Sequence, residues 1–238
     1  MDDNSVEYTE FEWPFPYSAV IAGGSGCGKT VYLAQIIRNH NKMCQQSLAG
    51  VLYFYAIHQP VYEEMEQEFG ELITFIQGSP DPYFATHDPK ELANHLVIFD
   101  DLQKELSKSD LLELIYSRMS HHNRFAVITV LQTFFGQEKS IRAALKNAHY
   151  FIFFQCNRMA ATLFHLQRQI VPQANSNFLT DAYAQCQKIP YSPMVLDMRP
   201  QANQLELCRQ EIFPTTGFHY VFLPSHLGRV KPTVQNNL

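Results

Sequence analysis

The segment from Gly23 to Thr30 carries the clearest chemical pattern in the chain. It consists of Gly23, Gly24, Ser25, Gly26, Cys27, Gly28, Lys29 and Thr30, which fits GxxxxGK[ST]. Glycines let backbone N–H groups turn toward an anion, and a following helix adds its positive end. The pattern predicts a loop that binds ATP, with Lys29 on the β- and γ-phosphates and the Thr30 hydroxyl on Mg²⁺. The alternative is a glycine-rich turn without a ligand. We interpret Cys27 as a small filler rather than a catalytic thiol.

Two carboxylates follow an apolar run at residues 96–99, namely Asp100 and Asp101. A strand that ends in this way beside a phosphate loop typically brings an Asp to the magnesium shell, so we assign Mg²⁺ to Asp100. Asp101 then occupies the position of the base that activates water, although its side chain is shorter than the usual Glu. The next apolar run ends at Gln132, which we predict to orient the water or sense the γ-phosphate. The alternative for Asp100 and Asp101 is that they are two solvated acids at a strand end. The alternative for Gln132 is that it is a polar strand-end residue bonded to the backbone.

A basic stretch surrounds this last run. Between residues 118 and 146 the chain has five basic residues and one acid, a net charge of +4, whereas the whole chain carries −5. The basic residues are Arg118, Arg124, Lys139, Arg142 and Lys146. They could contact DNA phosphates, or one arginine could reach the γ-phosphate of a neighbouring subunit. Ordinary helix-surface charge is the alternative.

Composition sets wide bounds. The 238 residues are 46% hydrophobic and 17% charged, which excludes a disordered chain, and a pI near 6.0 excludes a mostly basic, nucleic-acid-coating surface. The five cysteines form no CxxC pair, which argues against a zinc ribbon and a disulfide framework and favours a reducing compartment. The acidic beginning and the lack of an apolar run of about 18 residues predict neither a signal peptide nor a membrane span.

Continuous apolar runs alternate with helical patterns, which predicts a doubly wound α/β domain with strands buried on both faces. The predicted strands are 17–22, 51–56, 73–76, 96–99, 126–131 and 150–154, with shorter ones at 194–198 and 219–223. The predicted helices are 30–40, 110–119 with Ser109 as N-cap, 140–148, 159–170 and 178–187. We divide the chain into an N-terminal segment (1–16), an ATPase core (17–172) and a C-terminal appendage on the same domain (173–238).

Together these residues resemble the genome-packaging ATPases of double-stranded DNA viruses, of the poxvirus and polinton-like or adintovirus-like type, within the FtsK–HerA superfamily of P-loop NTPases. The resemblance covers about residues 11–200. The matching segments are Trp13-Pro14-Phe15, Ala22 to Thr30, His58-Gln59-Pro60-Val61-Tyr62-Glu63, Phe75-Ile76-Gln77-Gly78, Asp100-Asp101, Ser120-His121-His122-Asn123-Arg124, Gln132 and Asn147-Ala148-His149-Tyr150. The Gln-Pro-x-Tyr and Ser-His-His-Asn-Arg segments discriminate best.

The resemblance implies a central sheet in strand order 5-1-4-3-2 and an ATP- and Mg²⁺-dependent motor that drives double-stranded DNA into a preformed capsid. It implies a homo-oligomeric ring of five or six subunits, capsid or portal-vertex partners, and a place inside the infected cell, in nucleus or cytoplasm, or in the virion. It also implies an arginine that acts across the subunit interface, for which Arg142 is the first choice and Arg124 the second.

Two other classes remain open at this point: a nucleoside or nucleotide kinase, and a non-hydrolysing ATP-binding assembly protein. A kinase would need an arginine-rich lid after Gln132, and no RxxxR pattern is present there. Intact Lys29, Thr30 and Asp100 argue against an inert binder. The residue that stacks on the adenine is also open, between Trp13, Phe15 and a later position.

Overall fold

One sheet of ten strands runs through the computed structural model, which describes residues 5–8, 12–134, 138–170, 177–202, 206–213 and 219–224. Its order is β1-β10-β9-β8-β7-β2-β6-β5-β3-β4. The strands are β1 (Ser5–Tyr8), β2 (Ser18–Ala22), β3 (Gly50–Tyr55), β4 (Ile73–Gln77), β5 (His95–Asp100), β6 (Ala126–Leu131), β7 (Tyr150–Phe153), β8 (Met194–Asp197), β9 (Cys208–Gln210) and β10 (His219–Phe222).

The strands from β7 to β4 pair in parallel and form the core of the sheet. The run β7-β2-β6-β5-β3 has the predicted order 5-1-4-3-2, and β4 adds a strand beyond β3. The strand β6 therefore lies between β2, which precedes the phosphate loop, and β5, which ends in Asp100. This interposed strand argues against the kinase alternative, because small nucleotide kinases usually place the two strands side by side.

Successive side chains of the core strands enter two separate apolar clusters, one on each face of the sheet. On β5, Val97 and Phe99 pack on one face, and Leu96 and Ile98 pack on the other. Burial on both faces explains the continuous apolar runs of the sequence. Only β4 departs from this prediction, because it lies at the edge and its Thr74 and Gln77 are exposed.

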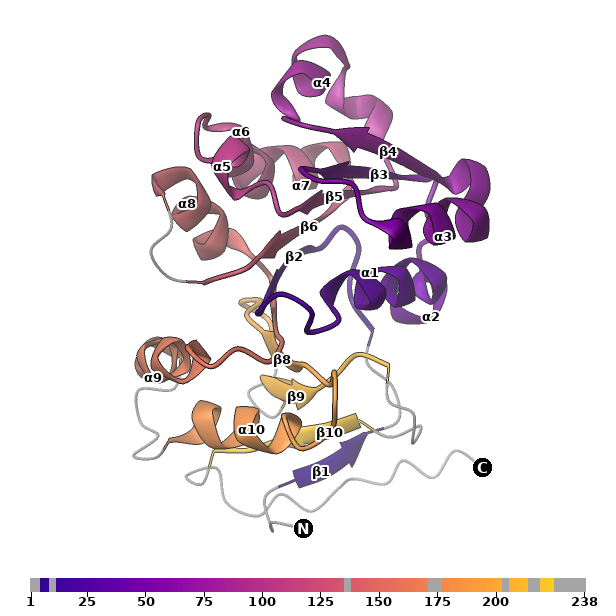
Figure 1. Ribbon diagram of the computed structural model, residues 1–238. Helices are drawn as coiled ribbons and strands as arrows, with labels where there is room; N and C mark the ends of the chain where they lie inside the picture. The colour runs from indigo at the N-terminus through magenta and orange to yellow at the C-terminus, as the bar shows by residue number, and fades with distance from the viewer. Residues whose placement is uncertain are drawn as a thin grey trace.

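Helices cover both faces, as Figure 1 shows. One face is covered by α1 (Lys29–Arg38), α2 (His40–Met43), α3 (Pro60–Phe69) and the 3₁₀ turn η1 (Gly70–Leu72). The other face is covered by α4 (Asp81–Thr86), the 3₁₀ turn η2 (Pro89–Leu92), α5 (Gln103–Leu106), α6 (Leu111–Leu114), the π-helix η3 (Ile115–Met119), α7 (Ser120–Asn123), α8 (Lys139–Asn147), α9 (Met159–Ile170) and α10 (Phe178–Cys186). The predicted α/β class is thus confirmed.

Beyond β7 the sheet continues with antiparallel strands from the C-terminal part of the chain. Its far edge is β1, whose Ser5 pairs with Phe222 of β10. Figure 1 shows β1 and β10 side by side at the bottom of the sheet. The described strands of residues 173–238 therefore extend the core sheet, while the domain boundaries themselves stay a prediction.

Some local predictions need correction. The helix expected over 110–119 begins at Leu111 and changes to a π-helix at Ile115, and Asp110 occupies the N-cap position that we gave to Ser109. The sequence patterns also missed α3, β1 and β9. The helix α3 carries a run of acids and begins with Pro60 at its first turn, a position that suits proline.

Candidate active site

The phosphate loop connects β2 to α1 and has the backbone that its glycines predict. Gly26 and Gly28 have φ angles of +73° and +95°, which side-chain-bearing residues rarely adopt. Gly23 is required for a different reason, since a Cβ there would lie 2.6 Å from the Cβ of Phe154. The loop therefore runs close over the end of β7, and α1 begins directly after Gly28.

The ammonium group of Lys29 lies inside this loop. Its Nζ donates to the carbonyl oxygens of Gly23 and Gly24, at 2.9 and 2.6 Å. The thiol of Cys27 donates to the Gly24 carbonyl at 2.9 Å, and burial raises the pKa of this thiol. A protonated, hydrogen-bonded thiol agrees with the filler role rather than with a nucleophile.

Asp100 is buried at the end of β5 and accepts two tyrosine hydroxyls on the same oxygen. Tyr53 donates to its Oδ2 at 2.6 Å, and Tyr62 donates to Oδ2 at 3.0 Å. Burial raises the pKa of Asp100, and the two hydrogen bonds oppose that rise because they favour the charged form. Both bonds end on Oδ2, and Asp100 lines the cavity beside the phosphate loop.

The Gln-Pro-x-Tyr segment explains where Tyr62 comes from. Gln59 precedes α3, and its Nε2 donates to the Tyr62 hydroxyl at 3.0 Å. One turn of α3 thus connects the loop after β3 to Asp100. Sequence reasoning selected this segment only as a family signature. The contact of Tyr53 and Tyr62 with Asp100 was missed, because it depends on the pairing of β3 with β5.

Asp101 and Gln132 meet at the ends of neighbouring strands. The Nε2 atom of Gln132 lies 2.9 and 3.0 Å from the two carboxylate oxygens of Asp101. Asp101 has a φ of +56°, which turns the chain sharply as β5 ends. The two predicted residues, 31 positions apart in the sequence, thus form one polar pair at the carboxyl edge of the sheet.

A cavity of about 710 Å³ contains these groups. It is lined by Ser25, Gly26, Gly28, Lys29, Thr30, Val31, Tyr32, Gln35, Gln59, Val61, Asp100, Asp101, Val130, Gln132, Ile189, Pro190, Tyr191, Ser192, Gln210, Glu211, Phe213 and Tyr220. The loop, both carboxylates and the glutamine therefore face a common space, whose size is usual for a small-molecule site. Among the described residues, no three His, Cys, Asp or Glu side chains come together as a metal-binding group.

The two named candidates for adenine stacking, Trp13 and Phe15, pack against other aromatic side chains of the protein. Trp13 is buried, and its ring stacks on Tyr150 with centroids 3.6 Å apart. Phe15 makes edge contacts with Tyr17 and His40. Neither Trp13 nor Phe15 lines the cavity, which leaves only the later position of the three alternatives.

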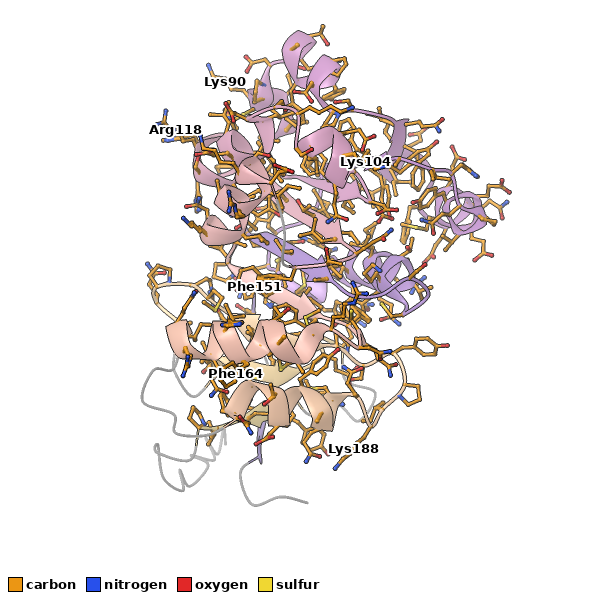
Figure 2. All side chains as sticks on the ribbon, turned by 60° about the vertical axis from the view of Figure 1, so that its left-hand side comes forward. Lys90, Lys104, Arg118, Phe151, Phe164 and Lys188 are labelled. Atoms are coloured by element: carbon orange, nitrogen blue, oxygen red, sulfur yellow. The ribbon has the colours of Figure 1, made fainter. Side chains whose placement is uncertain are left out.

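The basic residues of the 118–146 stretch are all exposed. On α8, Lys139, Arg142 and Lys146 follow helical spacing and form a basic stripe opposite the buried Ile141 and Ala144. Arg142 is not among the residues that line the cavity of its own chain. Figure 2 shows Arg118 at the outer margin of the molecule, on the face that α4–α8 cover.

Arg124 lies at the amino edge of the sheet, opposite the edge that holds the cavity, and it precedes the first residue of β6 by two positions. Two of the family segments meet there, since His121 Nε2 lies 3.4 Å from His149 Nε2. The His149 backbone N–H also donates to the Ser18 hydroxyl at 3.1 Å. These segments therefore tie strand beginnings together at the amino edge, whereas the cavity lies at the carboxyl edge.

No helix in the described part of the chain combines the length and the apolar character needed to cross a bilayer.

Comparison with known proteins identifies relatives of this arrangement. A family model described as "Poxvirus A32 protein" matches residues 13–171, which include the phosphate loop, both carboxylates and Gln132. No curated protein sequence matches the chain.

Solved structures share the fold at low sequence identity. The genome packaging NTPase B204 of Sulfolobus turreted icosahedral virus 2, in complex with sulfate, is 10% identical with a TM-score of 0.56, covering 83% of this chain and 96% of that one. Its complex with ATP-gammaS is 11% identical with a TM-score of 0.51, covering 83% and 97%. The flagellar accessory protein FlaH of Methanocaldococcus jannaschii is 11% identical with a TM-score of 0.50, covering 87% and 90%.

Proposed function

Because the chain belongs to the poxvirus A32 protein family, we propose that it is an ATP-hydrolysing motor that drives double-stranded viral DNA into a preformed capsid. The observation that carries the proposal is the convergence of Lys29, Asp100, Asp101 and Gln132 on one cavity. A solved neighbour of the same fold is described as a genome packaging NTPase and was captured with ATP-gammaS, which supports a nucleotide in this cavity.

The loop residues 23–30 would bind the phosphates through backbone N–H groups at the start of α1. The Lys29 ammonium exchanges its two carbonyl partners for β- and γ-phosphate oxygens when ATP enters. Thr30 and the carboxylate of Asp100 would hold Mg²⁺. The ion, when bound, neutralises the charge that develops on the phosphates.

Asp101 would accept the proton of the attacking water, and Gln132 would hold that water or contact the γ-phosphate. Their hydrogen-bonded contact supports a joint role, because both side chains end in the same part of the cavity.

We further propose a homo-oligomeric ring of five or six subunits, in which Arg142 of one subunit reaches the γ-phosphate of the next. The exposed position of Arg142 outside its own cavity supports an action in trans. The basic stripe of α8 supports contacts with DNA phosphates through Lys139 and Lys146. Docking on capsid or portal-vertex proteins, and a place in the infected cell or the virion, belong to the same proposal.

The proposal is tested by phosphate release from ATP with and without double-stranded DNA, in the absence of any phosphoryl acceptor. We expect DNA to raise the rate, and Lys29→Ala to lower it by at least ~10²-fold while the fold persists. Lys42→Ala is the matched control, because Lys42 is exposed on α2 and does not line the cavity. Turnover that ignores DNA, or that survives the Lys29 substitution, would contradict the proposal.

A further inference from the structure

The C-terminal part of the chain forms one wall of the cavity. Met194 begins β8 opposite Phe153, the last residue of β7, so the segment before β8 lies at the carboxyl edge of the sheet. Gln210 ends β9 opposite the same Met194, which brings the following residues to this edge as well. The wall consists of Ile189, Pro190, Tyr191, Ser192, Gln210, Glu211, Phe213 and Tyr220.

Large apolar side chains are exposed around the cavity, both at this wall and on α1. Among the described residues, six large hydrophobic side chains are exposed, and three of them line the cavity. These three are Val31 on α1, 58% exposed, and Ile189 and Tyr191 across the cavity, 51% and 71% exposed. Apolar surface that gathers at a cavity, rather than scattering, indicates a site for an apolar group.

The Tyr191 ring lies directly beside the phosphate loop. A Cβ added to Gly28 would be 3.1 Å from Cδ1 of Tyr191, which places the ring at the start of α1. Tyr191 has a φ of +62°, an unusual conformation for a residue with a large side chain. One side of the ring lies against the loop at Gly28, the side chain as a whole is accessible to solvent, and Tyr191 is among the residues that line the cavity.

Several contacts fix the wall in position. The backbone N–H of Ile212 donates to the Tyr32 hydroxyl of α1 at 2.7 Å. Gln210 Nε2 donates to the Ser192 hydroxyl at 3.0 Å, and the Phe213 ring lies 6.0 Å from that of Tyr32. Burial raises the pKa of Glu211, which also lines this wall. The aromatic surface is therefore preorganised by α1 and β9.

We propose that this wall is the nucleobase subsite, in which the base of the nucleoside triphosphate stacks on Tyr191 between Val31 and Phe213. The inference rests on the proposed nucleotide binding at the phosphate loop and deepens it. It concerns residues beyond the 13–171 range of the family match, so it assigns a role to the appendage that the family does not supply. Aromatic stacking accepts any base, because every base has a π-face.

The experiment compares two magnesium-bound ligands on the full chain by calorimetry, ATP and inorganic tripolyphosphate, which lacks a base. We expect Tyr191→Ala to weaken ATP binding on the order of 10-fold and to leave tripolyphosphate binding unchanged. Tyr191→Phe keeps the ring and should restore ATP affinity. Phe164→Ala is the matched control, because Phe164 is an exposed aromatic residue on α9 outside the cavity, labelled in Figure 2.

The tripolyphosphate arm separates this inference from the proposed function. Unchanged ATP affinity in Tyr191→Ala would overturn the base subsite, and so would equal losses for both ligands, because these indicate damage to the loop at Gly28. If the unsubstituted protein binds neither ligand, the nucleotide function itself fails. If it binds both with equal affinity, the loop stands and the base subsite falls.

Discussion

The side-chain amide of Gln132 holds the carboxylate of Asp101, with Nε2 at 2.9 and 3.0 Å from its two oxygens. An amide N–H fixes the direction of a carboxylate without taking its charge. Gln132 also follows β6, the strand that pairs with β2 and with β5. The strand β6 lies between β2, which leads to the phosphate loop, and β5, which leads to the carboxylates. The contact therefore connects the end of β6 to Asp101, the residue proposed as base.

Asp101→Asn should separate binding from chemistry. The variant keeps the size of the side chain but removes the proton acceptor, so ATP binding should persist while turnover falls about 10²-fold or more. Gln132→Ala should lower turnover less, because Asp101 loses its orientation but keeps its charge. Fluorescent-nucleotide titration and single-turnover hydrolysis measure the two quantities. Loss of nucleotide affinity in Asp101→Asn would contradict the assigned roles.

Tyr53→Phe and Tyr62→Phe should weaken magnesium binding. Each substitution removes a hydrogen bond that orients the carboxylate of Asp100 and favours its charged form, so the proposed Mg²⁺ ligand is held less well. Half-saturation with Mg²⁺ should rise about 10-fold.

Tyr55→Phe is the matched control for this pair. Tyr55 lies on the same strand as Tyr53, but its hydroxyl is not one of the two that bind Asp100. Equal Mg²⁺ dependence in all three variants would show that the two tyrosines only fill space.

Arg142→Ala should leave ATP binding intact and abolish hydrolysis, because an arginine finger is typically worth ~10³ or more in rate. Mixing this variant with Lys29→Ala should restore some activity, since an intact loop can then face an intact arginine across an interface. No recovery in mixtures that co-assemble would exclude Arg142 and turn attention to Arg118 and Arg124.

Stability should decrease as pH falls from about 6.5 to about 4. Burial, with His121 and Arg199 nearby and Asp197 opposing, lowers the pKa of His149 to about 4. The unfolded chain therefore binds a proton in this window that the folded chain does not, and folding loses ground as pH falls. His40 contributes with the same sign, because burial lowers its pKa to about 4.

The variant His149→Gln isolates this effect. Thermal unfolding at pH 7 and pH 5 should show a smaller drop in Tm for the variant than for the unsubstituted chain, by a few degrees. His122→Gln is the control, because His122 is exposed next to His121. An identical drop in all three proteins would contradict a neutral, half-buried His149.

The parts of the candidate site that consist of short contiguous motifs could be predicted from the sequence. The phosphate loop, Asp100–Asp101 and Gln132 each end a buried strand, so parallel pairing alone brings them to one edge. Tyr191 gave no signal, because one tyrosine in a proline-containing loop becomes a cavity residue only through the pairing of β8 with β7. Trp13 was a reasonable base-stacking candidate by type, yet its packing on Tyr150 is a tertiary contact.

Some elements of the fold could likewise be predicted from the sequence, and others could not. Strands buried on both faces were recognisable by their continuous apolar runs, and their order followed the family. The short β1 was not recognisable, because its partner β10 is distant in sequence. The strand β9 was not recognisable, because its three residues, Cys208–Gln210, include two polar ones and form no apolar run. The π-helix at Ile115–Met119 also has no signature in helical periodicity.

The pairing of β1 with β10 sets an order of assembly. Ser5 and Phe222 are pairing partners at opposite ends of the chain, so their contact closes one of the longest loops available to it. Closing that loop costs conformational entropy, and the contacts that offset this cost exist only when the intervening strands are already in place. We therefore expect this edge to form late and to open early. Tyr220 lies on the same β10 and lines the cavity. A bound nucleotide would therefore slow the opening of the edge farthest from the catalytic strands, and amide hydrogen exchange in β10 would report on occupancy.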